Sequence, residues 1–127
     1  MNSKYSFKFE NLTVYDRAME FGEIVNKLVA EFPVEERIEL RSQFKRAADA
    51  IALNIAEGSE EEDSQFYKYL GNALHNANEC VLCSSKARMR KYITFEEDEE
   101  NRRVIMELSK MITTLRNRIS TRIKSKK

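Results

Sequence analysis

The sequence predicts an all-α protein, an antiparallel up-down-up-down four-helix bundle, and three observations carry that prediction. The 127 residues include one proline and three glycines, too few for the many turns of a sandwich or barrel. Charged residues make up 34% of the chain, and Glu, Lys and Arg are strong helix formers. Apolar residues recur in alternating steps of four and three, the spacing of near-parallel packed helices. The length fits one domain, which we place at residues 13–127.

Residues 1–12 have the pattern of an extended N-terminal arm. Tyr5, Phe7 and Phe9 alternate with polar residues, the period of a strand with one apolar face. A single strand forms no sheet by itself, so this stripe either covers its own bundle or contacts another copy. Apolar stripes outside a core commonly mark contact surfaces, and the three aromatic residues are therefore candidates for a subunit junction.

The first two helices are predicted over residues 14–31 and 35–57. Thr13 has the side chain of a helix N-cap, and Pro33 ends the first helix because the residue before proline resists helical dihedrals. Gly58 fits the left-handed position just after the second helix. The inward positions are Val14, Ala18, Phe21, Val25, Leu28, Phe32, Leu40, Phe44, Ala47, Ala48, Ile51 and Ile55.

The third helix is predicted over residues 65–92, with Asp63 or Ser64 as its cap. Cys80 and Cys83 form a C-x-x-C pair in the middle of this helix. Structural zinc needs four ligands, and the chain has two cysteines and one histidine. Reactive thiols lie at helix N-termini, whereas this pair lies in the middle of a helix. We expect two small buried hydrophobic side chains.

The fourth helix begins after Thr94, which forms a capping box with Glu97. From Arg116 onward the chain has six basic residues and no acid, a basic tail that we expect to fray beyond Arg122. The rest of the chain has 16 basic and 21 acidic residues, a net charge of −5. Positive charge is therefore local, and the overall charge of +1 does not by itself indicate nucleic-acid binding.

The charge clusters have two interpretations. Acids gather at predicted helix N-termini and bases at C-termini, where each complements the helix dipole. The acidic connection after Gly58 shares one end of the bundle with the basic tail, and attraction between the two explains the layout without a ligand. Alternatively, the bases contact phosphates, which carry no sequence information. The candidate nucleic-acid contacts are Lys86, Arg88, Arg90, Lys91, Arg116, Arg118, Arg122 and Lys124.

Glu57 lies in the last turn of the predicted second helix, where a carboxylate opposes the helix dipole. Arg46 precedes it by about 16 Å along the axis, too far for an easy pair within the helix. One hypothesis is that Arg46, Asn54 and Glu57 form polar contacts at a subunit junction. The alternative is that these side chains face solvent without an assigned partner.

Catalytic, metal and cofactor chemistry has little support. His75 and Glu79 share a helix face, but a dinuclear carboxylate site needs a second histidine, and the chain has one. No nucleophile lies in a strained turn, and no glycine-rich phosphate loop is present. We expect a protein that is not an enzyme and has no cofactor. With no apolar stretch long enough for a membrane span and no secretory signal, we expect it in the cytoplasm.

Two stretches resemble a bacterial four-helix-bundle family. Phe9-Glu-Asn-Leu-Thr-Val-Tyr-Asp-Arg-Ala18 resembles its F-x-x-L-x-V-W-x-x-A opening. Gln43-Phe-Lys-Arg-Ala-Ala48, Ile51 and Asn54-Ile-Ala-Glu-Gly58 resemble its Q-x-R-R-A-A-x-S-I-x-x-N-I-A-E-G motif. This is the family of proteins encoded in 23S rRNA intervening sequences, and Tyr15 and Ala50 depart from its pattern, which has Trp and Ser there.

The resemblance implies a four-helix fold and a homopentameric ring. It also implies relatives that assist reverse transcriptases in retroelements, whereas rRNA binding is implied only weakly because the name records where the genes lie. The expected function is therefore an oligomeric helical protein that binds structured RNA or DNA through clustered basic residues. The alternative is a scaffold or accessory factor that recruits a protein partner, such as a reverse transcriptase, without binding nucleic acid.

Overall fold

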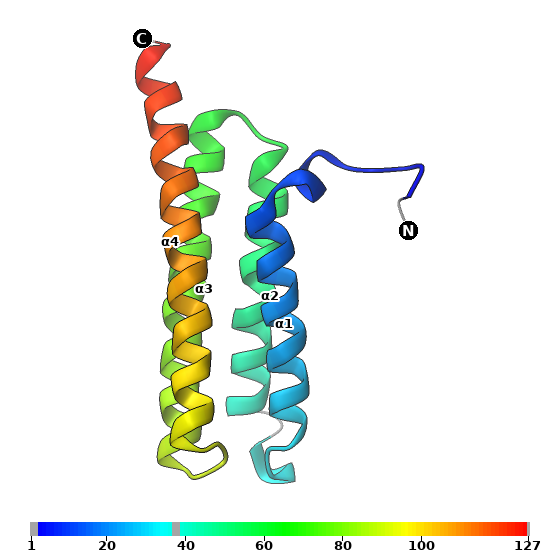
Figure 1. The fold of residues 1–127 in the computed structure, drawn as a ribbon, viewed down its shortest axis with the longest axis vertical. Helices are drawn as coiled ribbons and strands as arrows, with labels where there is room; N and C mark the ends of the chain where they lie inside the picture. Colours follow the sequence, from blue (N-terminus) through cyan, green and yellow to red (C-terminus); the bar gives the residue numbers. More distant parts are fainter. Residues whose placement is uncertain (1–2, 37–38, 127) are drawn as a thin grey trace.

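The computed structural model describes residues 3–36 and 39–126, and within these ranges it contains four long helices and no strand. They are α1 (Thr13–Ala30), α2 (Leu40–Ser59), α3 (Asp63–Met89) and α4 (Phe95–Ser125). Two short 3₁₀ helices, η1 (Lys8–Asn11) and η2 (Val34–Glu36), precede α1 and α2. The helices lie side by side along the long axis, with the α1–α2 and α3–α4 connections at one end and the α2–α3 connection at the other (Figure 1). The predicted all-α class is confirmed.

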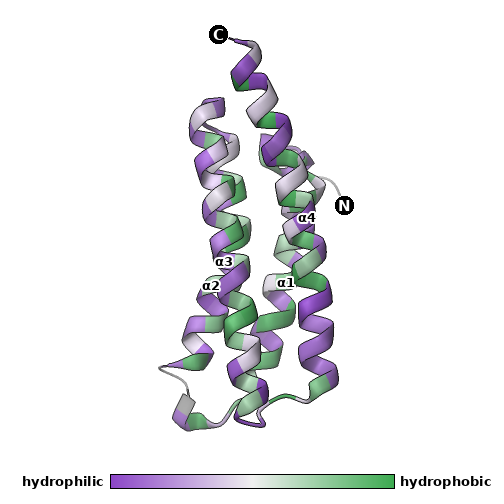
Figure 2. Ribbon diagram, turned by 90° about the vertical axis from the view of Figure 1, so that its left-hand side faces the viewer, coloured by the Kyte–Doolittle hydropathy of each residue, from purple (hydrophilic) through white to green (hydrophobic). Residues whose placement is uncertain are grey.

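The core follows the predicted spacing of four and three. The hydrophobic positions of the helices face one another, and the hydrophilic positions face outward (Figure 2). Of the inward positions predicted for the first two helices, only Leu28 is half-buried rather than buried. Small side chains at Ala47, Ala48 and Ala73 are buried where α2 packs on α3, which lets the two backbones approach closely.

Gly58 does not end α2 in a left-handed conformation, as the sequence suggested. It lies inside the helix, and none of the described glycines has a positive φ. A Cβ at Gly58 would lie 2.5 Å from Tyr69 Cβ and 2.9 Å from Phe66 Cδ1. The glycine is therefore needed for close packing of α2 on α3. The predicted left-handed position of Gly58 after the second helix was wrong.

The first turns of α1, α2 and α3 also differ from the predictions. Leu12, not Thr13, is the N-cap of α1, and α2 begins at Leu40 because Val34–Glu36 form the separate helix η2. Residues 37–38 of the predicted second helix lie outside the described residues. Glu62 is the N-cap of α3 and makes no side-chain capping bond. The side-chain caps predicted for α1 and α3 are therefore not formed.

At the α3–α4 connection, the start of α4 agrees with the prediction and the end of α3 does not. The capping box of α4 is confirmed, since the Glu97 N–H donates to Thr94 Oγ1 at 3.0 Å and the Thr94 N–H donates to Glu97 Oε1 at 2.8 Å. The third helix ends at Met89, three residues before its predicted end. Lys91 has a φ of 64°, and the Tyr92 N–H donates to the Ala87 carbonyl at 2.9 Å. These are the features of a Schellman motif, with a lysine where glycine is usual.

The N-terminal arm is not extended throughout its predicted length. Residues Lys8–Asn11 form η1, and the Phe7 N–H donates to Glu10 Oε1 at 2.7 Å. Phe9 packs edge-on against Tyr15 with 4.9 Å between ring centroids. Tyr5 and Phe7 stay 76% and 60% exposed, and the arm projects away from the bundle (Figure 1). The described helices contain no stretch long and apolar enough to cross a membrane.

Candidate nucleic-acid interface

The eight basic residues singled out in the sequence fall into two groups at opposite ends of the molecule. Lys86, Arg88, Arg90 and Lys91 lie where α3 ends, beside the α3–α4 connection. The other four, Arg116, Arg118, Arg122 and Lys124, lie on the C-terminal part of α4. Figure 1 places these two regions at opposite ends of the long axis. The eight residues therefore do not form one surface.

Arg88 is the member of the α3 group that pairs with a carboxylate. Arg88 Nη1 lies 3.4 Å from Asp98 Oδ2, and its guanidinium is 5.5 Å from the centroid of the Phe95 ring. Arg90 has an interaction as well. Lys91 occupies the left-handed position that ends α3. Arg88 and Lys91 therefore have structural roles at the α3–α4 connection, close to the acidic first turn of α4.

The carboxylate that receives Arg88 belongs to a buried polar network that sequence reasoning missed. The Asp98 side chain is fully buried, and Ser84 donates its hydroxyl proton to Asp98 Oδ1 at 2.6 Å. Arg102 Nε donates to Asp98 Oδ2 at 3.1 Å, and Asn101 Nδ2 donates to Ser84 Oγ at 2.9 Å. The available signal was a serine in an otherwise apolar seam, because a buried hydroxyl requires a hydrogen-bond partner.

At the other end, part of the basic tail is paired. Arg122 Nη2 lies 2.8 Å from Asp63 Oδ1, and Lys126 Nζ lies 3.1 Å from Asp63 Oδ2. Hydrogen bonds from these two cations lower the pKa of Asp63 from 3.8 to about 2. The pairs confirm that the acidic connection and the basic tail share one end. They also help to explain why α4 continues to Ser125 instead of fraying beyond Arg122.

Arg116 is fixed in place without a carboxylate. Its Nε donates to the Tyr67 carbonyl at 3.1 Å, and its guanidinium lies 3.9 Å from the centroid of the Tyr67 ring. Gly71 makes room for this arrangement, because a Cβ there would lie 2.7 Å from Arg116 Nη2. A carbonyl and an aromatic ring orient the guanidinium but do not cancel its charge.

Two hollows without acidic lining residues flank this part of α4. One, of about 510 Å³, lies against α3 and is lined in part by Lys68, His75 and Arg116. The other, of about 470 Å³, lies toward α1 and is lined in part by Lys110 and Arg118. Sequence reasoning missed Lys68 and Lys110, because each is a single lysine far along the chain from the basic tail.

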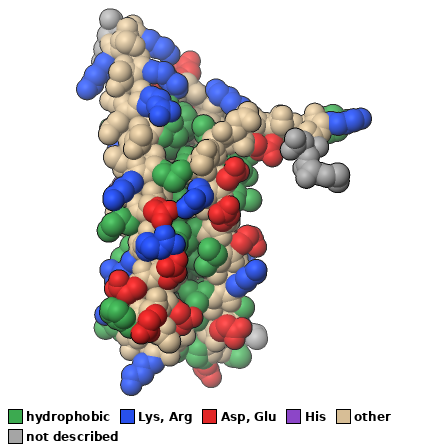
Figure 3. Space-filling view, in the orientation of Figure 1, with side chains coloured by type: hydrophobic (Ala, Val, Ile, Leu, Met, Phe, Trp, Pro, Cys, Tyr) green, Lys and Arg blue, Asp and Glu red, His purple; other side chains and the backbone are tan. Residues whose placement is uncertain are grey.

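These cations define what we call the basic ridge: Lys68, Lys110, Arg116, Arg118 and Lys124. None of them has a carboxylate partner in the part of the chain that the structure describes. Glu107 is the last acid on α4, and residues 64–78 of α3 contain none. In Figure 3, Lys and Arg side chains gather over the C-terminal part of α4, whereas most of the Asp and Glu side chains on this face lie lower on the molecule.

The three polar candidates for a subunit junction are not brought together within the chain. Asn54 Nδ2 donates to Asn76 Oδ1 of α3 at 2.8 Å, and Arg46 Nη2 lies 3.4 Å from Ser42 Oγ. The Glu57 side chain is exposed and has no hydrogen bond or ion pair with the described residues. Asn54 thus holds α2 against α3, while the described residues supply no partner for the Glu57 carboxylate.

The residues considered for catalysis and metal binding have ordinary surroundings. Cys80 and Cys83 are buried, as predicted. Burial raises the pKa of both thiols, that of Cys83 to about 11. His75 is exposed on α3, and Glu79 accepts a hydrogen bond from Gln43 at 3.4 Å. Residues 3–36 and 39–126 contain no group of three or more side chains placed to hold a metal ion.

Comparison with known proteins places the chain in a family. A solved structure of a protein of unknown function from the S23 ribosomal protein family of Bacteroides thetaiotaomicron VPI-5482 has the same fold, with a TM-score of 0.76 and 24% identity. The match covers 82% of this chain and 95% of that one. No curated protein sequence matches. The sequence model of the 23S rRNA-intervening sequence protein family matches residues 10–114, and the chain therefore belongs to that family.

Proposed function

We propose that this chain is a cytoplasmic, non-enzymatic bundle of up-down-up-down antiparallel topology that binds the phosphate backbone of structured RNA or DNA through the basic ridge. The observation that carries the proposal is the set of ridge cations without carboxylate partners among the described residues, on a part of α3 and α4 that has no acid. Cations that are already paired release fewer counterions on binding nucleic acid, so unpaired ones contribute most to affinity.

The dimensions of the ridge suit a nucleic-acid backbone. Lys110 and Lys124 are fourteen residues apart on α4, about 21 Å along the helix axis. One strand of B-DNA has about six phosphates over that length. Arg116 lies between them with its guanidinium already held by Tyr67, which lowers the entropy lost when it binds a phosphate. The ridge has no feature that reads base edges, so we expect little sequence preference.

The test is binding of a fluorescent rRNA hairpin and of a DNA duplex, measured by anisotropy between 50 and 300 mM KCl. We expect Arg118→Gln/Lys124→Gln to weaken binding roughly tenfold or more at 0.1 M salt and to lower the salt slope by about 2. Lys27→Gln/Lys45→Gln removes the same charge from exposed positions on α1 and α2 and should change neither the affinity nor the salt slope. Absence of binding at 50 mM KCl, or equal losses in both variants, would overturn the proposal.

Self-association is a second part of the proposal. The exposed Tyr5 and Phe7 support it, because the free chain leaves these aromatic side chains in water. Five copies is the number that the family resemblance implies. Native mass spectrometry should then give about five times the 14.9 kDa of one chain, and a single species of 14.9 kDa would contradict it.

Recruitment of a protein partner, such as a reverse transcriptase, is the alternative function. Met89 and Phe95 support it, because they are 77% and 56% exposed at the α3–α4 connection, at the end opposite the ridge. This alternative predicts capture of the partner that survives 500 mM salt and nuclease and is lost in Met89→Ser/Phe95→Ser. If capture of the partner is lost in Arg118→Gln/Lys124→Gln and not in Met89→Ser/Phe95→Ser, the basic ridge and not the α3–α4 connection binds the partner.

A further inference from the structure

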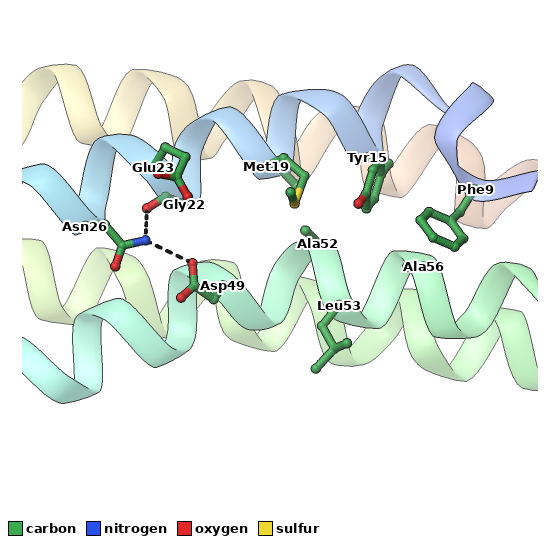
Figure 4. Close-up of a pocket in the computed structure, with 11 residues that line it drawn as sticks. Phe9, Tyr15, Met19, Gly22, Glu23, Asn26, Asp49, Ala52, Leu53 and Ala56 are labelled. Carbon is green, nitrogen blue, oxygen red and sulfur yellow. Dashed lines mark hydrogen bonds between the residues drawn. The ribbon is translucent and has the colours of Figure 1, made fainter. Parts of the chain in front are cut away.

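A groove between α1 and α2 combines an apolar floor with acidic walls. Its volume is about 440 Å³, and Tyr15, Met19, Ala52 and Ala56 supply much of its lining. Phe9 and Tyr15 lie at one end of the groove in Figure 4, and the polar side chains lie at the other. Such a surface suits a ligand that is aromatic along one side and positively charged at its edges.

The polar end of the groove has two carboxylates without cationic partners among the described residues. Glu23 and Asp49 line it, and neither has an ion-pair partner among the described residues. Asn26 donates Nδ2 to the Gly22 carbonyl at 2.9 Å and to Asp49 Oδ1 at 3.4 Å (Figure 4). Its Oδ1 is buried and has no hydrogen-bond partner. The lining includes two acids and no base.

The N-terminal arm has the complementary chemistry. Residues 3–9 include Lys4 and Lys8 and no acid, and these lysines alternate with the exposed Tyr5 and Phe7. The Phe7 N–H is bonded to Glu10 and the Phe7 ring stacks on Phe9 at 5.9 Å, so the arm leaves the bundle at η1. In Figure 1 the arm projects away from the helices of its own bundle.

We propose that the arm of one copy docks in the α1–α2 groove of a second copy. Tyr5 and Phe7 cover the apolar floor, and Lys4 and Lys8 lie toward Glu23 and Asp49. The proposal deepens the self-association part of the proposed function by naming both surfaces. Since arm and groove are different surfaces, the contact is heterologous, the type of contact from which rings are built when its rotation closes.

The area buried by one docked arm is small. Each aromatic side chain buries about 150–250 Å², so one arm and the groove surface it covers together bury about 600–1,000 Å². Each junction of a ring holds one arm in one groove, so this is also the area per junction. It is below the roughly 1,200–2,000 Å² of stable interfaces, so the contact depends on the complementary charges of the arm and the groove.

The test exchanges charges between the two surfaces and measures mass by sedimentation velocity from 1 to 50 µM without nucleic acid. Lys4→Glu/Lys8→Glu and Glu23→Lys/Asp49→Lys should each raise the dissociation constant of the assembly at least about tenfold. The variant with all four changes should recover the wild-type mass. A mixture of the two double variants should reach a higher mass than either variant alone, because the acidic arm of one fits the basic groove of the other. The two variants must alternate, so the mixture does not restore a five-membered ring.

Controls separate this proposal from self-association in general. Lys27→Glu/Lys91→Glu changes two exposed lysines that line neither surface and should leave the mass unchanged, whereas Tyr5→Ser/Phe7→Ser should lower it. An assembly that is insensitive to all arm and groove variants would overturn arm docking while self-association stands. A wild-type mass of 14.9 kDa at 50 µM would overturn both. A mixture of the two double variants whose mass does not exceed that of either one alone would contradict exchange of arms between copies.

Discussion

The two ends of the α3–α4 hairpin hold similar numbers of cations in opposite electrostatic settings. Where α4 begins, Arg88 and Arg102 both lie against the buried carboxylate of Asp98. In the C-terminal half of α4, Asp63 pairs with Arg122 and Lys126, and the ridge cations have no carboxylate partner among the described residues. The difference teaches that a basic cluster predicts a phosphate-binding surface only where the fold leaves its charges unpaired.

The largest effect is expected at the neutralised end. Asp98→Ala removes an acceptor from Ser84 and Arg102 and should lower the free energy of unfolding by about 2–4 kcal/mol, measured by urea denaturation. Leaving buried donors unpaired has costs of this order. We expect this loss of unfolding free energy to be smaller than that for breaking a fully buried ion pair. Both arginines are about 40% exposed and keep access to water.

The matched control for Asp98→Ala is Glu99→Ala, one residue away and exposed. It should change the free energy of unfolding by less than about 0.5 kcal/mol. If Asp98→Ala costs no more than this control, the network does not stabilise the hairpin, and the contrast between the two ends is lost.

An intermediate effect is expected at Lys91, whose φ of 64° strains a residue with a Cβ. Lys91→Gly should raise the free energy of unfolding by roughly 0.5–1 kcal/mol, because glycine adopts this conformation without the steric penalty. A rise in the melting temperature would show it.

Lys91→Ala keeps the Cβ and serves as the control, with no stabilisation expected. The same pair of variants tests the role of the charge. Nucleic-acid binding should be unchanged in both, since we place Lys91 outside the basic ridge. Weaker binding in both variants would restore the α3 cluster as a phosphate contact.

The helices and the core were predictable because packing period dominates them. The steps of four and three selected side chains such as Phe21, Phe44 and Leu70, and these are fully buried. The ends of helices were less predictable, because contacts distant in sequence decide them. Gly58 is required by Tyr69 of the next helix, and no local pattern distinguishes this glycine from one that ends a helix.

The candidate interface was predictable only in part for the same reason. The basic tail is visible as a run of charges, but its pairing with Asp63 depends on two helix ends that meet only in the folded chain. Lys68 and Lys110 join Arg116 and Arg118 beside two hollows through helix packing alone. Sequence reasoning identifies charges, whereas the structure identifies which of them remain unpaired.

The smallest expected effect concerns Asp63, which is half-buried and whose partners Arg122 and Lys126 are exposed. Its pKa is about 2 in the folded chain and 3.8 as its ordinary value, so the pairs stabilise the fold above pH 3.8. This contribution is lost as the pH falls toward 2, because protonation then favours the unfolded state. Asp63→Asn should therefore lower the urea midpoint slightly at pH 7 and not at pH 2. Glu61→Gln changes a neighbouring acid whose side chain has no described partner, and it should leave the urea midpoint unchanged at both pH values.

Because salt screens exposed pairs, 0.5 M KCl should reduce the difference in urea midpoint between the wild type and Asp63→Asn at pH 7. A difference that persists in high salt would mean that Asp63 holds the end of α4 by more than these two ion pairs, and Arg122 would then be unavailable to phosphate.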